Sequence, residues 1–192
     1  MAINDNCTFF IMKSNNEDNI HKSIKYGVWT STEFSNKKLN NAYLNCKKNG
    51  GRLFLLFSVN NCGYFLGIAE MISEVDFNGK FPLWSKNIWM GKFNVEWKYI
   101  KDVPYSDFRH LKIDNDSKPI SKCKDCTEID KLIGMNALKI MANYVEKCSV
   151  LDMFEEYDVK ERNELVEKDQ GKASEEKWRG RRRGGRRCHE EY

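Results

Sequence analysis

An uninterrupted apolar run, RLFLLFSV at residues 52–59, is the strongest constraint that this sequence places on its fold. Successive side chains of a β-strand point to opposite faces, so a strand that is apolar at nearly every position is buried on both. A tight turn at residues 60–63 (NNCG) and a second apolar stretch at 64–72 follow, which predicts a hairpin. We therefore predict a buried central strand.

Other periodic segments add elements around that strand. Alternation predicts a half-buried strand from Phe93 to Tyr99, with Trp97 in the core. A short strand is also expected at residues 7–12. Helical spacing of apolar residues predicts helices at 19–25, 36–48 and 128–147, and a further amphipathic stretch from Val150. Together these elements predict a mixed α/β domain of about 150 residues, with a mostly antiparallel, curved sheet and helices around it.

The composition limits the class of protein. Hydrophobic residues make up 41% and aromatic residues 12% of the chain, which is enough for a core. No apolar run approaches the roughly 18 residues of a membrane span, and the N-terminus does not resemble a signal peptide. The seven cysteines are odd in number and scattered, which favours reduced thiols over a disulfide framework. We expect an intracellular protein that does not bind membranes.

Motifs for metal binding or catalysis are incomplete. Cys123 and Cys126 have the spacing of a zinc knuckle, but no second C-x-x-C provides the remaining ligands, so incidental thiols are the favoured interpretation. The histidines are isolated, and neither a deaminase signature nor a nucleophile elbow or phosphate-binding loop occurs. We assign no catalytic residue, no metal and no cofactor.

The end of the chain differs in composition from the rest. Residues 178–187 (WRGRRRGGRR) contain six arginines and three glycines, which cannot form a core. The segment resembles arginine–glycine arms that contact nucleic acid, and a solvated tail or a targeting signal is the alternative. We expect a folded domain over residues 7–158 and a disordered, basic tail over residues 159–192.

The stretch FPLWSKNIWMGKF at residues 81–93 holds two tryptophans whose spacing suits no regular element. On a helix Trp84 and Trp89 would point about 140° apart, and on a strand they would face opposite sides. A loop is therefore expected. Trp29, after Gly27, is a third indole outside a clear amphipathic pattern, so the three rings either form an aromatic pocket or cover the edges of the core.

Lysines near these tryptophans favour one class of ligand for such a pocket. Aromatic cages bind cations against the ring faces, or bases through stacking. A cage for a cation usually has acidic neighbours, whereas the neighbours here are Lys13, Lys86, Lys92 and Lys98. These charges favour a phosphate-bearing partner with its nucleobase in the pocket.

Several segments, in their order along the chain, resemble the YTH domain. They are FFIMKSNNEDNIHKSIKYGVWTSTEFSNKKLNNAY, LFLLFSVN, GIAEM, WSKNIWMGKFNVEW, KDVP, RHLKI and KPISKCKDCTEI, within residues 7–148. The similarity is greatest to the branch of cytoplasmic readers in animals and plants. The resemblance implies a barrel-like sheet surrounded by helices, and a non-catalytic reader of N6-methyladenosine in single-stranded RNA.

The resemblance also implies roles for individual residues. The cage positions match Trp29, Trp84 and Trp89. Asn19 matches the residue that hydrogen-bonds the adenine N1, the backbone N–H of Asn15 matches the contact to N3, and the carbonyl of Thr30 accepts the N6–H. The positions along the RNA backbone match Lys13, Ser14, Arg109, Lys124 and Asp125.

Two of these positions have specific consequences. Lys124 stands where the family usually has arginine, which keeps the charge but loses the planar fork of a bidentate contact. Asp125 is expected to organise the loop.

The resemblance leaves the biological setting less constrained. We expect a monomer that binds N6-methyladenosine-modified mRNA and takes protein partners from RNA processing or decay. A cytoplasmic location is expected, with the nucleus as the alternative. A competing interpretation is a general single-strand RNA-binding protein that is indifferent to methylation, and an enzyme that processes the modified base is a third.

Overall fold

Strand β3, Arg52–Val59, lies inside the sheet, as the apolar run predicts. The structure is a computed structural model that describes residues 6–84, 89–113 and 118–167. Six strands pair in the order β2-β5-β4-β3-β1-β8, and β6 and β7 form a separate pair. The other strands are β1 Cys7–Ser14, β2 Val28–Trp29, β4 Tyr64–Met71, β5 Phe93–Pro104, β6 Lys112–Ile113, β7 Lys118–Pro119 and β8 Thr127–Ile129.

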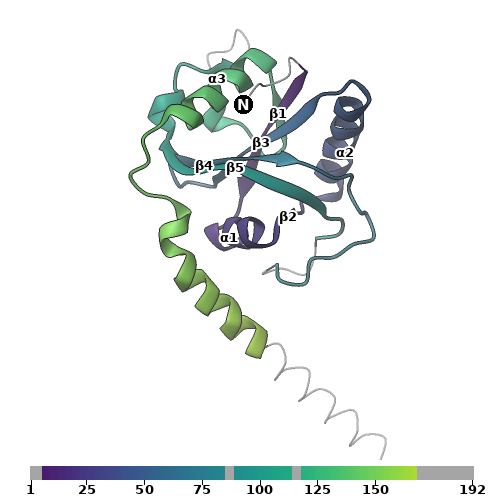
Figure 1. Ribbon diagram of the computed structural model, residues 1–192, viewed down its shortest axis with the longest axis vertical. Helices are drawn as coiled ribbons and strands as arrows, with labels where there is room; N and C mark the ends of the chain where they lie inside the picture. Colours follow the sequence, from purple (N-terminus) through teal and green to yellow (C-terminus); the bar gives the residue numbers. More distant parts are fainter. Residues whose placement is uncertain (1–5, 85–88, 114–117, 168–192) are drawn as a thin grey trace, which may run out of the picture. The chain divides into compact units, whose positions relative to one another are not determined.

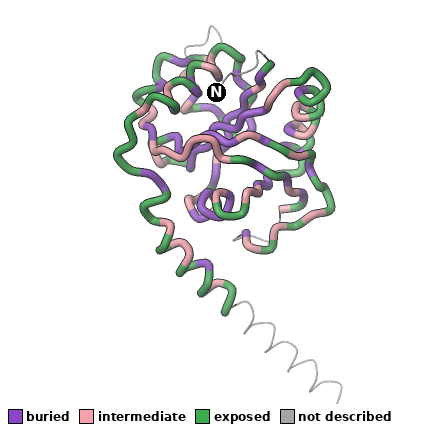
Figure 2. The backbone as a smooth tube through the Cα atoms, viewed as in Figure 1, coloured by how far each residue is buried: buried purple, intermediate pink, exposed green. Residues whose placement is uncertain are grey.

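Helices cover both faces of β3 and its neighbour β1. Phe54 and Leu56 join a core with residues of α3, Lys131–Asn143. On the opposite face lies α2, Glu33–Lys48, where Cys46 Sγ donates to Thr8 Oγ1 at 3.2 Å. Figure 1 shows α3 and α2 on opposite sides of β1 and β3, and Figure 2 shows buried residues concentrated along these strands. Burial on two faces explains why residues 52–59 are almost entirely apolar.

The sheet is mostly antiparallel and curls into a half-barrel, as expected. Only β1 and β3 pair in parallel among the described strands of this sheet. The β4–β5 register shifts near Gly67, and such bulges bend a sheet. A side chain at Gly67 would meet the backbone oxygen of Tyr99, so glycine permits this close approach.

The helices begin or end at residues other than those predicted. The first two are α1, Glu17–Tyr26, and α2, which both begin before the predicted ranges because Asn16 and Thr32 cap them. The helix expected over 128–147 is wrong at its start, because residues 127–129 form β8 beside β1. Asp130 accepts a hydrogen bond from the N–H of Leu132 at 2.7 Å and begins α3 there. The helix ends at Asn143.

Short 3-10 turns complete the first compact unit, Met1–Met153. They are η1 Tyr105–Phe108, η3 Ile120–Lys122 and η4 Val150–Met153. Trp97, expected in the core, is half-buried, with its ring centroid 4.8 Å from that of Phe57.

The second unit is Phe154–Tyr192, and its described part is a helix over residues 154–167. The arginine-rich segment at 178–187 lies outside the described residues, and the domain boundary near residue 158 stays a prediction. Within the described ranges, no helix has the length and apolar character to cross a membrane.

One carboxyl group in β5 should make stability depend on pH. Asp102 is half-buried, and its Oδ1 has no hydrogen-bond partner among the described residues. Burial, together with the nearby Glu17, Asp152 and Glu146, raises the pKa of Asp102 from 3.8 to about 6, although the Val150 N–H opposes this. The folded state therefore holds a proton more tightly than the unfolded chain does. The contribution of Asp102 to the free energy of unfolding therefore falls as the pH rises from about 4 to about 6.

Asp102→Asn should accordingly raise the free energy of unfolding at pH 7, because the amide is never charged. The gain over wild type should shrink as the pH falls toward 4, measured by urea unfolding across that range. Asp107→Asn, at an exposed position in η1, is the control. A gain that is equal at pH 4 and pH 7 would contradict the explanation by charge.

Candidate nucleic-acid interface

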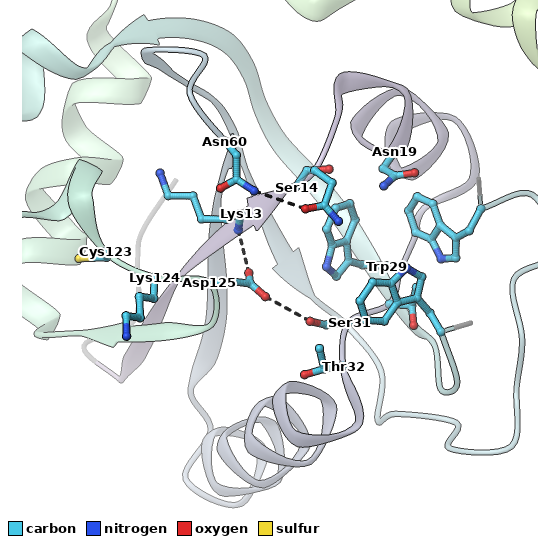
Figure 3. Close-up of a pocket in the computed structure, with 14 residues that line it drawn as sticks. Lys13, Ser14, Asn19, Trp29, Ser31, Thr32, Asn60, Cys123, Lys124 and Asp125 are labelled. Carbon is cyan, nitrogen blue, oxygen red and sulfur yellow. Dashed lines mark hydrogen bonds between the residues drawn. The ribbon is translucent and has the colours of Figure 1, made fainter. Parts of the chain in front are cut away.

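A cavity of about 460 Å³ opens beside the end of β1 and the starts of α1 and α2. Its volume is within the range of small-molecule sites, roughly 300–1,000 Å³. Ten predicted site residues line it: Lys13, Ser14, Asn15, Asn19, Trp29, Thr30, Trp84, Trp89, Lys124 and Asp125. Figure 3 shows how side chains from separate elements converge there. Arg109, also predicted, is exposed beyond η1 and does not line the cavity.

Two of the tryptophan rings stand at right angles. The ring centroids of Trp29 and Trp84 are 5.3 Å apart with an interplanar angle of 81°. Trp29 also packs edge-to-face on Phe57, and Trp84 on Phe81. The arrangement forms two adjacent walls of a corner, not a parallel sandwich. A flat ligand can stack on one ring while its edge meets the other.

Strand β2 positions the first of these rings. Gly27 takes a left-handed conformation (φ 63°) that ends α1 and turns the chain into β2. Trp29 then pairs with Phe93 of β5, at the edge of the sheet. The hydroxyl of Thr30 donates to the Gly91 carbonyl, which ties this edge to the segment after Trp89.

The loop between β4 and β5 carries the other two rings and is closed at its base. Asp76 and Lys92 exchange backbone hydrogen bonds of 2.8 and 3.1 Å, and the Gly91 N–H donates to the Gly79 carbonyl at 3.0 Å. Gly91 has a φ of 87°, which favours glycine. Trp84 and Trp89 therefore extend from a loop whose two ends are hydrogen-bonded together.

Asn36, on the buried side of α2, connects that loop to the start of the helix. Its Nδ2 donates to the carbonyl of Met90 at 2.9 Å and to that of Ser31 at 3.2 Å. Its Oδ1 accepts from the Ser31 N–H at 3.1 Å. One buried amide thus holds the segments that follow Trp29 and Trp89 at fixed separation.

The asparagines near the cavity have different roles. Asn16 caps α1 by accepting from the Asn19 N–H at 3.0 Å, while the buried Oδ1 of Asn19 has no partner among the described residues. Figure 3 shows Asn19 on α1, on the side of the cavity where Trp29 lies. Asn15 is exposed and accepts from Asn60 Nδ2 at 3.4 Å. Ser14 Oγ donates to the Asn16 carbonyl at 2.7 Å.

Lys13 is bonded internally at both its backbone and its side chain. Its ammonium donates to Ser58 Oγ at 2.9 Å, to Tyr105 Oη at 3.0 Å and to the Ser121 carbonyl at 3.1 Å. Burial lowers the pKa of Lys13 and raises that of Tyr105 to about 12. These bonds occupy all three ammonium protons, so a contact of Lys13 with the RNA backbone stays a prediction and would require rearrangement.

Asp125 joins two walls of the cavity. Its Oδ1 accepts from the Lys13 N–H at 2.8 Å and its Oδ2 from Ser31 Oγ at 3.3 Å, bonds that are drawn in Figure 3. Burial of the carboxyl raises the pKa of Asp125 despite these donors. Such bonds fit the expected role in organising the loop. They engage both carboxylate oxygens of Asp125 within the protein.

Two of the lysines that lie near the tryptophans in sequence do not line the cavity. Lys98 pairs with Glu70 at 3.2 Å, and neither it nor Lys92 lines the cavity. Lys86 lies outside the described residues. Lys124 is exposed on the cavity wall and supplies the accessible positive charge there.

The two cysteines with knuckle spacing are buried. Cys126 Sγ donates to the Ser35 carbonyl at 3.8 Å, and burial raises the pKa of Cys126 to about 11. Burial raises the pKa of Cys123 as well. A protonated thiol is a poor metal ligand, and within the described part of the chain no group of three potential ligands includes either cysteine.

Four lining residues were not predicted, namely Ser31, Thr32, Asn60 and Cys123. Ser31 and Thr32 directly follow Trp29-Thr30, so their place could have been found from adjacency in the sequence. Asn60 reads only as a turn residue, and nothing in the sequence pattern links it to Asn15. Its position depends on β1 and β3 ending side by side.

Comparison with known proteins agrees with this geometry. The family model for the YT521-B-like domain, YTH, matches residues 7–142. The chain belongs to the YTH family. It is 44% identical over 156 residues to YTH domain-containing family protein 2 of Danio rerio, which covers 81% of this chain and 25% of that protein. It is 43% identical over 153 residues to YTH domain-containing protein ECT3 of Arabidopsis thaliana, which covers 78% of this chain and 31% of that protein.

A solved YTH structure has the same fold. The YTH domain of the Zygosaccharomyces rouxii MRB1 protein, in complex with N6-methyladenosine RNA, is 33% identical with a TM-score of 0.69, covering 76% of this chain and 93% of that one. The family and the mixed α/β fold expected from the sequence are confirmed. The chain spans about a quarter to a third of the length of these two curated YTH relatives.

The Asn36 bridge can be tested without a ligand. Asn36→Ala should lower the free energy of unfolding by about 1–3 kcal/mol, because it leaves buried backbone groups without partners. Amide hydrogen exchange should also become faster at Ser31 and Gly91. Asn41→Ala, at an exposed position of the same helix, is the matched control. Wild-type exchange rates at Ser31 and Gly91 in the Asn36→Ala protein would show that the bridge does not hold these segments.

Proposed function

We propose that this protein is a non-catalytic reader that binds N6-methyladenosine in single-stranded RNA. The observation that carries the proposal is the cavity wall made by Trp29, Trp84 and Trp89, with Asn19 beside them. The relative from Zygosaccharomyces rouxii was solved with N6-methyladenosine RNA, which supports the same ligand class here.

The chemistry of the cavity suits a neutral, methylated base. N6-methyladenine carries no charge, and Asp125, the acidic residue among the described lining residues, is engaged by two donors. The base can stack on one indole while the methyl group packs against another. The amide of Asn19 can donate to the ring N1, which an ionised carboxylate could not do.

The expected discrimination against adenine is finite. Burial of one methyl group contributes about 0.8 kcal/mol, and close packing adds to that. An unmethylated amino group would also leave an N–H without a partner in an apolar cage. The sum corresponds to roughly one to two orders of magnitude in affinity, at about 1.4 kcal/mol for each factor of ten.

In this proposal the tryptophan cage and the basic surface have different roles in binding. The cage residues carry the preference for methylated RNA, while Lys124, Arg109 and the arginine-rich segment supply attraction to phosphates. A protein with the second part alone would bind RNA regardless of methylation. Binding of matched methylated and unmethylated RNA separates these two functions.

We further infer that the protein works on mRNA in the cytoplasm. The six described cysteines are present as thiols and four of them are buried, which supports a reducing compartment. Partners from RNA processing or decay would use surfaces away from the cage.

Trp84→Ala and Trp89→Ala should reduce the preference for a methylated oligonucleotide to nearly one. Each removes a wall that the methyl group would contact, and fluorescence anisotropy with matched RNAs measures the effect. Trp97→Phe is the control, because Trp97 packs on Phe57 outside the cavity. Circular dichroism confirms that each variant is folded, and wild-type discrimination by a folded Trp84→Ala protein would refute the cage.

Replacement of the six arginines in residues 178–187 by glutamine should weaken binding of both RNAs by the same factor. Because each cation that contacts a phosphate releases counterions, the dependence of affinity on salt should also become less steep. Titrations at several salt concentrations measure this. A change in methyl preference would show that the segment contributes to recognition of the base.

A further inference from the structure

Phe34 is the most exposed aromatic side chain among the described residues. It is 78% exposed, whereas the next, Tyr64, is 41% exposed. Phe34 is the second residue of α2, two positions after Thr32, which lines the tryptophan cavity. An exposed ring that close to a binding site is unusual, since aromatic side chains normally bury most of their surface.

The surroundings of Phe34 on its helix are polar. Residues three, four and seven positions later share its face, and they are Lys37, Lys38 and Asn41. The ring is therefore isolated and does not extend into an apolar patch along α2, as a protein-binding face would require. A single aromatic ring with neighbouring cations is instead typical of sites where bases of single-stranded nucleic acid stack.

Hydrogen bonds fix the backbone of the start of α2, from which Phe34 extends. Thr32 Oγ1 accepts from the Ser35 N–H at 3.1 Å and caps the helix. Lys38 Nζ donates to the Cys126 carbonyl at 3.1 Å, which ties this turn to the loop that carries Lys124 and Asp125. Backbone that is fixed before binding loses little entropy when a ligand arrives.

The charges near the ring suit a phosphate. Lys37 pairs with Glu33 at 2.6 Å, but both side chains are more than 60% exposed, so this pair contributes little and can exchange for a phosphate. Lys124 is exposed on the cavity wall beyond Cys126.

We propose that Phe34 stacks on a base next to the N6-methyladenosine in bound RNA. The proposal rests on the function proposed above and extends it to a second nucleotide. The cage holds the modified base, the strand leaves past Thr32, and the neighbouring base lies on the ring of Phe34 with its phosphate near Lys37.

The test compares a ligand that reaches Phe34 with one that does not. Phe34→Ala should weaken binding of a methylated RNA heptamer by about 5- to 100-fold, the range for loss of one base–aromatic stack, and leave binding of the N6-methyladenosine nucleoside unchanged. Phe34→Trp should retain heptamer binding. Leu44→Ala, at a 40% exposed position of the same helix, should bind both ligands as wild type does.

A fluorescent base locates the contact. In separate heptamers, 2-aminopurine replaces the base on each side of the modified base. At one of these positions, the wild-type protein should quench the 2-aminopurine fluorescence more strongly than Phe34→Ala does. Equal heptamer affinity for wild type and Phe34→Ala would overturn the proposal and favour a protein contact for this ring. An equal loss for nucleoside and heptamer would also overturn it, since Phe34 would then act on the cage.

The two proposals can fail separately. Equal affinity of the wild-type protein for methylated and unmethylated heptamers would refute the reader function. The ratio of the affinities of wild type and Phe34→Ala for the unmethylated heptamer would still decide whether the ring stacks on RNA.

Discussion

The parallel pairing of β1 with β3 is the constraint on which the rest of the structure depends. Parallel neighbours cannot be joined by a tight turn, so the chain must cross over the sheet between them. Here residues 15–51 make that crossing as α1, β2 and α2. Midway, β2 pairs with β5 at the far edge of the sheet, and this detour carries Trp29 and Thr30 to the cavity. The site is thus a consequence of how the connection is routed.

Hydrogen bonds between segments far apart in sequence then shape the cavity. Asp125 accepts from the backbone of Lys13, 112 positions earlier, and Asn36 donates to the carbonyl of Met90, 54 positions later. Each such bond contributes only about 1 kcal/mol net, but leaving its partner buried and unpaired costs more. The polar groups around the cavity therefore favour one arrangement of its walls. Their effect is to fix geometry, since the Lys13 ammonium and the Asp125 carboxylate both bond to neutral groups of the protein.

Patterns that depend on local periodicity could be read from the sequence. The buried strand at 52–59 and the loop origin of Trp84 and Trp89 follow from side-chain spacing, and their place beside Trp29 came from the family resemblance. The strand at 127–129 could not be read, because only its pairing with β1 distinguishes it from the start of a helix. The hydrogen bonds of the Lys13 ammonium could not be predicted from the sequence either, because the tertiary structure brings Ser58, Tyr105 and Ser121 to it.

The closed base of the loop between β4 and β5 has a consequence for how such a site can change. Backbone hydrogen bonds between Asp76 and Lys92 join the ends of the loop, and the Asp76 carboxylate also accepts from two backbone N–H groups just inside it. Trp84 and Trp89 both lie inside this closed segment. Two of the three indoles can therefore be exchanged as a unit, by mutation or by grafting, while the sheet keeps its register. The third, paired into the sheet edge beside Phe93, would stay constant as ligand preference diverges.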